Sequence, residues 1–190
     1  MEVLELIKKR RTIRKFQNRE IPYNLLESYV DAARLIPSAA NLQPLKYAIV
    51  NDSKMNDKVF ETLKWAGYLK GTYTPKENER PAGYIIVCVD FNISKANYDM
   101  DVGAACENII LSALDDGIGA CWLASVDREK LSKLLCLSDN LAVSCVVALG
   151  YPSEAPKDTE MQNGDVKYYL KDGVLNVPKR SLKEVIIKKF

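Results

Sequence analysis

The sequence predicts a three-layer fold, either α/β or α+β, in which helices cover both faces of a β-sheet. Segments with helical spacing of apolar residues alternate, imperfectly, with short apolar runs rich in β-branched residues. The chain has 190 residues, of which 47% are hydrophobic and 27% charged. A chain of this size and composition forms one globular domain and buries roughly 70% of its unfolded surface. We therefore expect a single domain over residues 1–190.

Helices are expected wherever apolar residues recur at helical spacing. Pro22 suits the first turn of the second helix and Pro37 ends it, whereas Asp52 or Ser53 can cap the third and Asp127 the fifth. The fourth carries the widest apolar stripe, so we expect it to be central and largely buried. The expected helices are 3–7, 23–36, 53–65, 99–116, 128–136 and a short final helix after Ser181.

Four apolar, β-rich runs predict the strands of the core, at 47–51, 84–90, 120–124 and 142–149. Residues 67–83 follow neither period and carry turn residues. They form a loop, either a substrate lid with Trp65, Tyr68 and Tyr73 as stacking side chains or a plain surface loop.

Residues 152–180 contain Pro, Gly and charge, with little periodicity and no hairpin signal. So long an aperiodic segment is expected to pack on something, and a partner subunit is the obvious candidate.

Composition excludes several classes of function. The chain has no His, which excludes a Ser-His-Asp or Cys-His nucleophile, a His general base and any zinc site that uses His. The net charge is only +2, so neither a nucleic acid nor an anionic membrane is an expected partner. The first residues, MEVLELIKKRR, lack the apolar core of a signal peptide, and no apolar run reaches the length of a membrane span. We expect a soluble, cytoplasmic protein.

The cysteines predict no metal or redox site. No two of them form a CxxC pair, and all but Cys136 lie in strongly apolar stretches, namely Cys88, Cys106, Cys121 and Cys145. Small buried hydrophobic side chains in a reducing compartment are the favoured interpretation.

Three polar segments can carry chemistry. The run Arg10–Arg14 offers three guanidiniums and a hydroxyl, which suits a phosphate but also fits a solvated basic face. The segment PSAANLQP, residues 37–44, offers neutral donors and acceptors that suit a heteroaromatic ring, but it also fits an ordinary loop bounded by Pro. At Ala124 and Ser125 a predicted strand ends before a capped helix, which leaves backbone N–H groups free.

Five motifs together resemble the FMN-dependent nitroreductase family. RRTIRKF resembles its RRSxRxF, PSAANLQP its PSxxNxQP, and ALGYP its LGYP. DVGAACENIILSALDDGIGACWL resembles its central helix and the turn that follows, and PKRSLKEVI its basic C-terminal segment. The resemblance implies an α+β fold with a mainly antiparallel central sheet flanked by helices. It also implies an intertwined homodimer with shared active sites, in which residues 152–190 form an arm that packs on the partner subunit.

The resemblance assigns the phosphate end of FMN to the two ends of the chain. Arg10 and Thr12 would hold the phosphate, with Lys179 or Arg180 reaching it, and Arg11 would lie along the ribityl-phosphate side. All of these are donors suited to an oxyanion.

For the flavin ring, the resemblance places Arg14 near N1 and O2, where positive charge stabilises the anionic reduced form. Pro37, Ser38 and Asn41, with Gln43 close by, would approach the ring from the other subunit.

A backbone N–H of Ala124 or Ser125 would reach flavin N5. Many relatives have Gly-Gly where this chain has Ala-Ser, and a conformation restricted to Gly would not survive that change.

The implied activity is an FMN oxidoreductase with a two-step exchange. NADH or NADPH would reduce the flavin, and a nitroaromatic, quinone or similar conjugated acceptor would then take the electrons. No protein acid or base is needed, which agrees with a chain without His. A reductive dehalogenase, a flavin-fragmenting enzyme and a flavin-binding module without turnover remain alternatives.

Overall fold

The computed structural model describes residues 2–69 and 71–190, so Lys70 of the predicted 67–83 loop lies outside the described residues. Its centre is a four-stranded sheet in the order β1-β2-β4-β3, with every neighbouring pair antiparallel. The strands are β1 (Leu45–Val50), β2 (Gly83–Asp90), β3 (Gly119–Leu123) and β4 (Leu141–Gly150). The expected α+β class with a mainly antiparallel sheet is confirmed.

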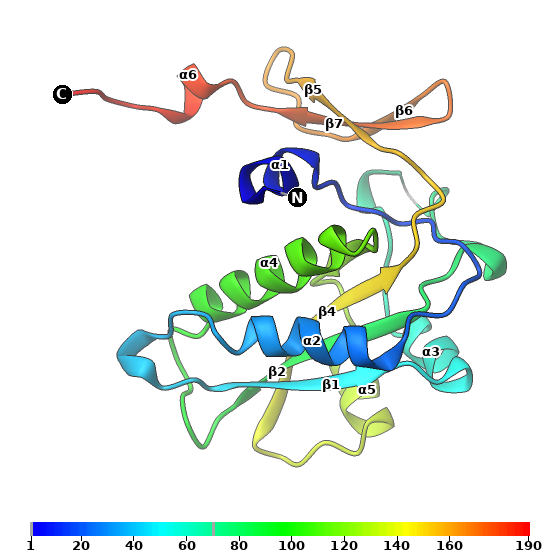
Figure 1. Cartoon of the computed structure of the whole chain (residues 1–190), viewed down its shortest axis with the longest axis vertical. Coiled ribbons are helices and arrows are strands. Elements are labelled where there is room, and N and C mark those ends of the chain that lie inside the picture. The colour runs from blue at the N-terminus through cyan, green and yellow to red at the C-terminus, as the bar shows by residue number, and fades with distance from the viewer. Residues whose placement is uncertain (1, 70) are drawn as a thin grey trace.

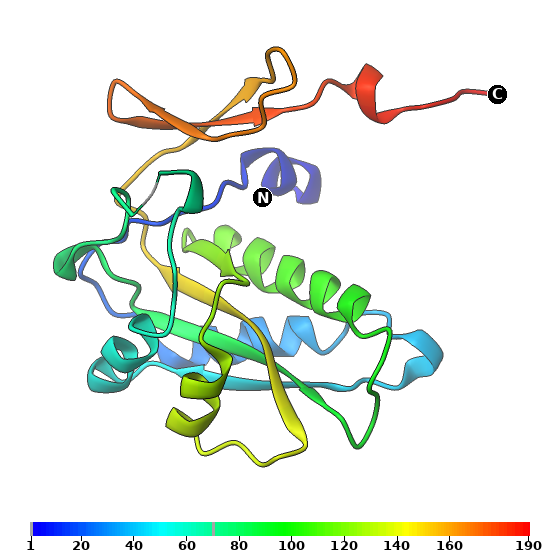
Figure 2. The ribbon, with the colours of Figure 1, turned by 180° about the vertical axis from the view of Figure 1, so that it is seen from behind.

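Helices cover both faces of this sheet (Figures 1 and 2). Alternate residues of β2 explain the layers, because Ile85 and Val87 pack in one core cluster and Ile86 and Cys88 in the other. The first cluster includes side chains of α2 (Tyr23–Ala33) and α4 (Asp99–Asp115), and the second those of α3 (Ser53–Phe60) and α5 (Arg128–Leu134). The three-layer arrangement expected from the pattern is therefore confirmed.

Two helices end earlier than the sequence suggested. α3 stops at Phe60 rather than near Trp65, because the Thr62 hydroxyl donates to the Val59 carbonyl and Leu63 then pairs with Val126. α2 stops at Ala33. The side-chain amide of Asn108, on α4, donates to the Ala32 carbonyl at that end. Both endings depend on partners that are distant in the chain.

The segment 152–180 is more regular than expected. It forms a second sheet in the order β5-β7-β6, from β5 (Lys157–Glu160), β6 (Tyr169–Lys171) and β7 (Val174–Lys179). β6 and β7 form a hairpin through Asp172 and Gly173, whose φ values are 52° and 74°. The expectation that hairpins are absent was wrong, since Asp-Gly between two β-rich runs is a sequence signal for such a turn.

This second sheet packs on the same chain. Leu175 is 1% exposed and contacts Ala66 and Tyr73 in the segment between α3 and β2. That segment holds two 3₁₀ turns, Gly67–Leu69 and Glu77–Glu79. In both ribbon views α1 (Val3–Lys9) lies between the second sheet and α4 (Figures 1 and 2).

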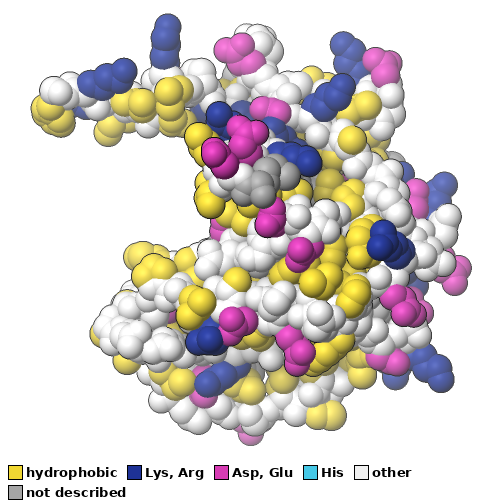
Figure 3. Space-filling model, in the orientation of Figure 1, with side chains coloured by type: hydrophobic (Ala, Val, Ile, Leu, Met, Phe, Trp, Pro, Cys, Tyr) yellow, Lys and Arg dark blue, Asp and Glu magenta, His cyan; other side chains and the backbone are white. Residues whose placement is uncertain are grey.

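The last residues extend away from the body. Ser181 caps α6 (Leu182–Val185), as expected, through a capping box with Glu184. Ile187 is 98% exposed. Figure 3 shows a hollow in the surface between this tail and the body. That the arm packs on a partner subunit stays a prediction.

Candidate functional site

The basic run follows α1 and joins the edge of the central sheet. Thr12 pairs with Ala120 of β3, and the Ile13 N–H donates to the Ala120 carbonyl at 2.9 Å. The approach is close because Gly119 has no side chain, since a Cβ there would lie 2.7 Å from Ile13 Cγ1. The run is therefore held by main-chain pairing rather than left as a free surface loop.

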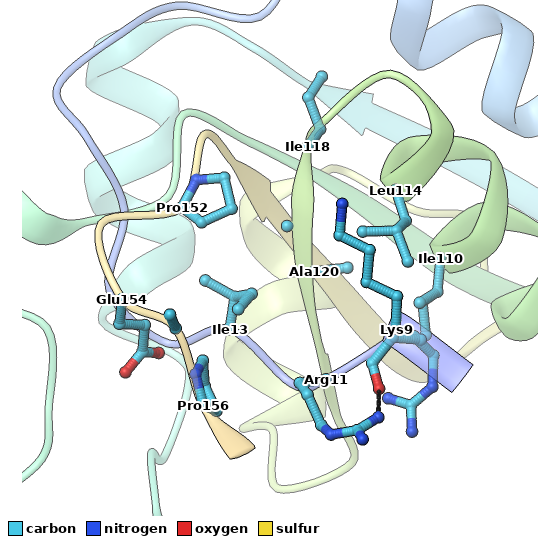
Figure 4. Close-up of a pocket in the computed structure, with 13 residues that line it drawn as sticks. Lys9, Arg11, Ile13, Ile110, Leu114, Ile118, Ala120, Pro152, Glu154 and Pro156 are labelled. Carbon is cyan, nitrogen blue, oxygen red and sulfur yellow. Dashed lines mark hydrogen bonds between the residues drawn. The ribbon is translucent and has the colours of Figure 1, made fainter. Parts of the chain in front are cut away.

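A cavity of about 240 Å³ opens beside this run, between α1, α4 and β3 (Figure 4). Arg10 lines it, and Arg10 Nε lies 3.6 Å from a carboxylate oxygen of Glu107 on α4. The Arg11 guanidinium pairs with the Asp158 carboxylate and donates to the Lys8 carbonyl at 2.8 Å. The floor is apolar, from Ile13, Ile110, Leu114, Ile118 and Ala120. A basic rim over an apolar floor suits a ligand that is anionic at one end.

Arg14 is fixed by contacts at both its backbone and its side chain. Its backbone N–H donates to the Glu154 carboxylate, which also accepts from the Lys15 N–H at 3.1 Å and from the Tyr73 hydroxyl. The Arg14 guanidinium lies 4.7 Å from the ring centre of Tyr168. Burial and the hydrogen bond to Glu154 raise the pKa of Tyr73 well above its usual range, so this phenol is a neutral donor. Sequence reasoning did not single out Glu154.

The two ends of the chain meet near Asp158. The hydrogen bond from Arg11 is the main reason that the pKa of Asp158 is lowered, and the charge of Lys179 adds to it. Lys179 ends β7, and Arg180 pairs with Glu184 at 3.4 Å. The structure thus brings Lys179 close to Asp158, the partner of Arg11, whereas Arg180 is engaged at the start of α6. That either residue reaches a phosphate stays a prediction.

The 37–43 segment is held by a buried acid. The Ser38 hydroxyl donates to Asp101, which is 4% exposed, and accepts the Gln43 N–H at 3.0 Å. Gln43 Nε2 donates to the Asn41 carbonyl at 3.1 Å. Ala40, Asn41 and Gln43 all have left-handed backbones, with φ between 50° and 55°. Asp101 was missed because it lies inside the apolar central helix, and its place in the first turn was the available signal.

The turn after β3 offers free donors, as predicted. The carbonyls are engaged, since Lys64 N–H donates to Ser125 at 3.0 Å and Arg128 to Ala124 at 3.1 Å. The N–H groups of Ala124 and Ser125 have no acceptor among the described residues. Neither residue has a left-handed backbone, so the change from Gly-Gly meets no conformational obstacle here.

One chain does not bring all these segments together. Asp101, which holds Ser38, and Glu107, which faces Arg10, are both on α4 and six positions apart, or roughly 9 Å along the axis. The floor of the cavity begins further along, at Ile110. Pro37, exposed, starts the segment at the opposite end of α4 from the cavity.

Other features of the described residues add little to the site. Cys88, Cys106, Cys121 and Cys145 are buried and Cys136 is exposed, as expected. No group of three or more acidic or Cys side chains in the described part of the chain could hold a metal ion. Among the described helices, none has the length and apolar character to cross a bilayer.

Comparison with known proteins gives a consistent result. The family model described as "Nitroreductase family" matches residues 7–74 and 92–151. A protein of Archaeoglobus fulgidus named "Putative NADH dehydrogenase/NAD(P)H nitroreductase" is 38% identical over 80% of this chain and 87% of its own. An iodotyrosine deiodinase of Haliscomenobacter hydrossis is 27% identical over 86% and 85% of the two chains.

Among solved structures, an FMN-dependent nitroreductase from Clostridium difficile R20291 has a TM-score of 0.66. It is 23% identical, with 80% of this chain and 88% of that chain covered, and so supports the fold. The family model spans more than half of the chain, and the Archaeoglobus relative is similar over most of it. The chain therefore belongs to the nitroreductase family.

Proposed function

We propose that this protein is an FMN-dependent oxidoreductase that moves electrons from NADH or NADPH to a nitroaromatic, quinone or similar conjugated acceptor. The observation that carries the proposal is the cavity between α1, α4 and β3, with Arg10 at a basic rim and an apolar floor beneath it. Family membership supports it.

The residues of the rim fit the phosphate end of FMN. Among the described residues, the ion-pair contact of Arg10 is the one with Glu107 at 3.6 Å, so its guanidinium keeps donors for an oxyanion. Thr12, two positions further along the run, pairs with Ala120 and carries a hydroxyl donor, and Lys179 adds positive charge from the arm. Arg11 differs, because its guanidinium is already paired with Asp158. In this proposal Arg10 and Thr12 bind the phosphate directly, whereas Arg11 holds the arm in place.

The ring end needs a positive charge and a hydrogen-bond donor. Arg14 supplies the charge that would stabilise the anionic reduced flavin, and Ala124 or Ser125 supplies a free N–H for N5. FMN itself supplies the hydride chemistry when bound. The chain has no His, and in this proposal its side chains bind and orient rather than act as acid or base.

Each site is shared between two chains in this proposal. The 37–43 segment, with Ser38, Asn41 and Gln43, lies beyond the first turn of α4, away from the Arg10 cavity. In this proposal a second copy of the chain therefore supplies these residues to each site. The tail after Ser181 exposes large apolar side chains, among them Ile187, that a partner subunit could bury. The protein is then a homodimer with a small-molecule acceptor.

The first test is the visible spectrum of the purified protein. We expect a flavin absorbance, release of FMN on denaturation and anaerobic bleaching by NADH or NADPH. A colourless protein that does not take up added FMN would overturn the proposal. A bound flavin that neither nucleotide bleaches would leave a binding module without turnover.

A reductive dehalogenase is the second candidate, because the chain resembles an iodotyrosine deiodinase over most of its length. A screen that offers the reduced protein halogenated phenols, nitroaromatics and quinones separates the two. Faster reoxidation by a halogenated phenol, with halide release, would favour dehalogenation.

A further inference from the structure

Glu154 lies where three parts of the chain meet. It follows β4, two residues after Pro152, and Figure 4 shows it at the rim of the cavity near Ile13. One carboxylate oxygen accepts the backbone N–H groups of Arg14 and Lys15, and the other accepts the Tyr73 hydroxyl. These hydrogen bonds join positions about 140 and 81 residues apart in the chain. A carboxylate that accepts several such bonds fixes its donors strongly.

The Tyr73 side of this contact belongs to the segment between α3 and β2. Tyr73 is 6% exposed and packs with Ala66 and Leu175. This segment reaches Arg14 by a second route as well. The rings of Tyr68 and Tyr168 pack in a tilted arrangement with their centres 5.0 Å apart, and the Tyr68 N–H donates to the Tyr168 hydroxyl at 3.3 Å. The ring of Tyr168 lies beneath the Arg14 guanidinium.

Arg14 is therefore held at its backbone through Glu154 and at its guanidinium through Tyr168. Both of these residues contact the segment between α3 and β2, Glu154 at Tyr73 and Tyr168 at Tyr68. We propose that Glu154 is a positioning residue that sets the place of Arg14 and couples it to this segment. The inference rests on the proposed function, in which Arg14 stabilises the reduced flavin. On this inference, the segment between α3 and β2 supports the site and is not a plain surface loop.

The test compares Glu154→Ala with Glu154→Gln in the FMN-loaded protein. The alanine variant lets Arg14 move, so we expect FMN to bind about tenfold more weakly and the flavin midpoint potential to become more negative. The glutamine variant keeps an oxygen for the two N–H groups and an amide that can face the Tyr73 oxygen. It should stay within about threefold of the wild-type affinity.

Glu79→Gln is the matched control. Glu79 contacts the Lys15 side chain at 3.4 Å, and no contact with Arg14 is found among the described residues. We expect its FMN affinity and potential to equal those of the wild type. If Glu154→Ala fails to fold, Tyr73→Phe replaces it, since it removes only the hydroxyl, and a loss of about threefold in the same direction is expected.

Combination with Arg14→Ala decides how Glu154 acts. If Glu154 works through Arg14, adding Glu154→Ala to Arg14→Ala should cause no further loss of FMN affinity. Additive losses, or a lowered melting temperature with unchanged affinity and potential, would overturn the inference alone. If the protein binds no FMN, or if Arg14→Ala changes neither its FMN affinity nor its flavin potential, the proposed function on which the inference rests would be contradicted instead.

Discussion

The 10–14 segment and the 37–43 segment are held in place by different means. Thr12 and Ile13 of the first pair with β3, so its position follows from the central sheet. The second has no strand partner among the described residues and instead turns sharply through left-handed Ala40, Asn41 and Gln43. The first segment is held by pairing with the edge strand β3, and the second by its left-handed turns and by Asp101 in the first turn of α4.

Both segments nevertheless depend on a carboxylate from elsewhere in the chain. Glu154 accepts N–H groups of the first, and Asp101 accepts the Ser38 hydroxyl of the second. Both segments have donors that no regular secondary structure satisfies, backbone N–H groups in the first and a side-chain hydroxyl in the second, and a carboxylate accepts them in charge-assisted hydrogen bonds. The two segments are also separated along α4, so in the proposed dimer the two segments of one chain contribute to different active sites.

A mixed dimer gives the largest expected effect. At an FMN concentration near the wild-type Kd, Arg10→Ala and Asn41→Ala homodimers should each have little turnover, because each substitution weakens one part of both sites. In a heterodimer purified with two tags, one site would collect both lesions and the other none. We expect about half of the wild-type turnover per dimer to return if the two sites are independent. No recovered flavin binding would show that each site comes from one chain.

Arg10→Ala alone tests the first segment. Loss of a charge-assisted contact worth about 1.5–3 kcal/mol should weaken FMN binding roughly ten- to a hundredfold. The fold should persist, because Arg10 lies at the cavity rim and not in the core. FMN titration with circular dichroism as a control measures both. Unchanged affinity would make the run a solvated basic face.

Gly119→Ala displaces the first segment without changing a charge. The added Cβ would lie within 3.0 Å of Ile13 and Pro152, so either the 10–14 segment moves or the free energy of unfolding falls by about 1–3 kcal/mol. Gly103→Ala on α4 is the control, since no atom lies within 4 Å of its Cβ position, and it should be neutral or stabilising. Thermal melts should separate the two, and equal melting temperatures would contradict the close approach at β3.

Asp101→Asn tests the second segment with a smaller change. The amide oxygen can still accept the Ser38 hydroxyl, but a neutral acceptor is weaker, so we expect a loss of about 1 kcal/mol in stability. Asp31→Asn, at an exposed position of α2, is the control and should have no effect beyond its own pair with Arg34. Chemical denaturation measures both variants. A gain in stability for Asp101→Asn would mean that the buried charge is not well satisfied.

The thiols should show the smallest effect. Burial raises the pKa of Cys88 to about 11 and that of Cys121 to about 12, so neither forms much thiolate near neutral pH. We expect a thiol reagent at pH 8 to label Cys136 rapidly in the native protein and the buried thiols only on unfolding. Cys136→Ala should abolish the rapid phase and leave turnover unchanged. A fall in turnover would reveal a redox role at Cys136.

The sequence by itself determined the layers of this protein. The continuous apolar run of β2 predicts a strand buried on both faces, and the wide stripe of α4 predicts a central helix. The arm hairpin was also predictable, because Asp172-Gly173 is a local turn signal that needs no distant partner. Periodicity and turn chemistry depend on neighbours in the chain, so they can be recognised without the fold.

The tertiary structure alone decided which side chains support the site. Glu154 meets Arg14 across 140 positions, and Asp101 meets Ser38 across 63. The end of α3 is likewise set by the pairing of Leu63 with Val126. Contacts of this kind depend on how the elements pack, and no local pattern of residues encodes the distance between two segments once the chain has folded.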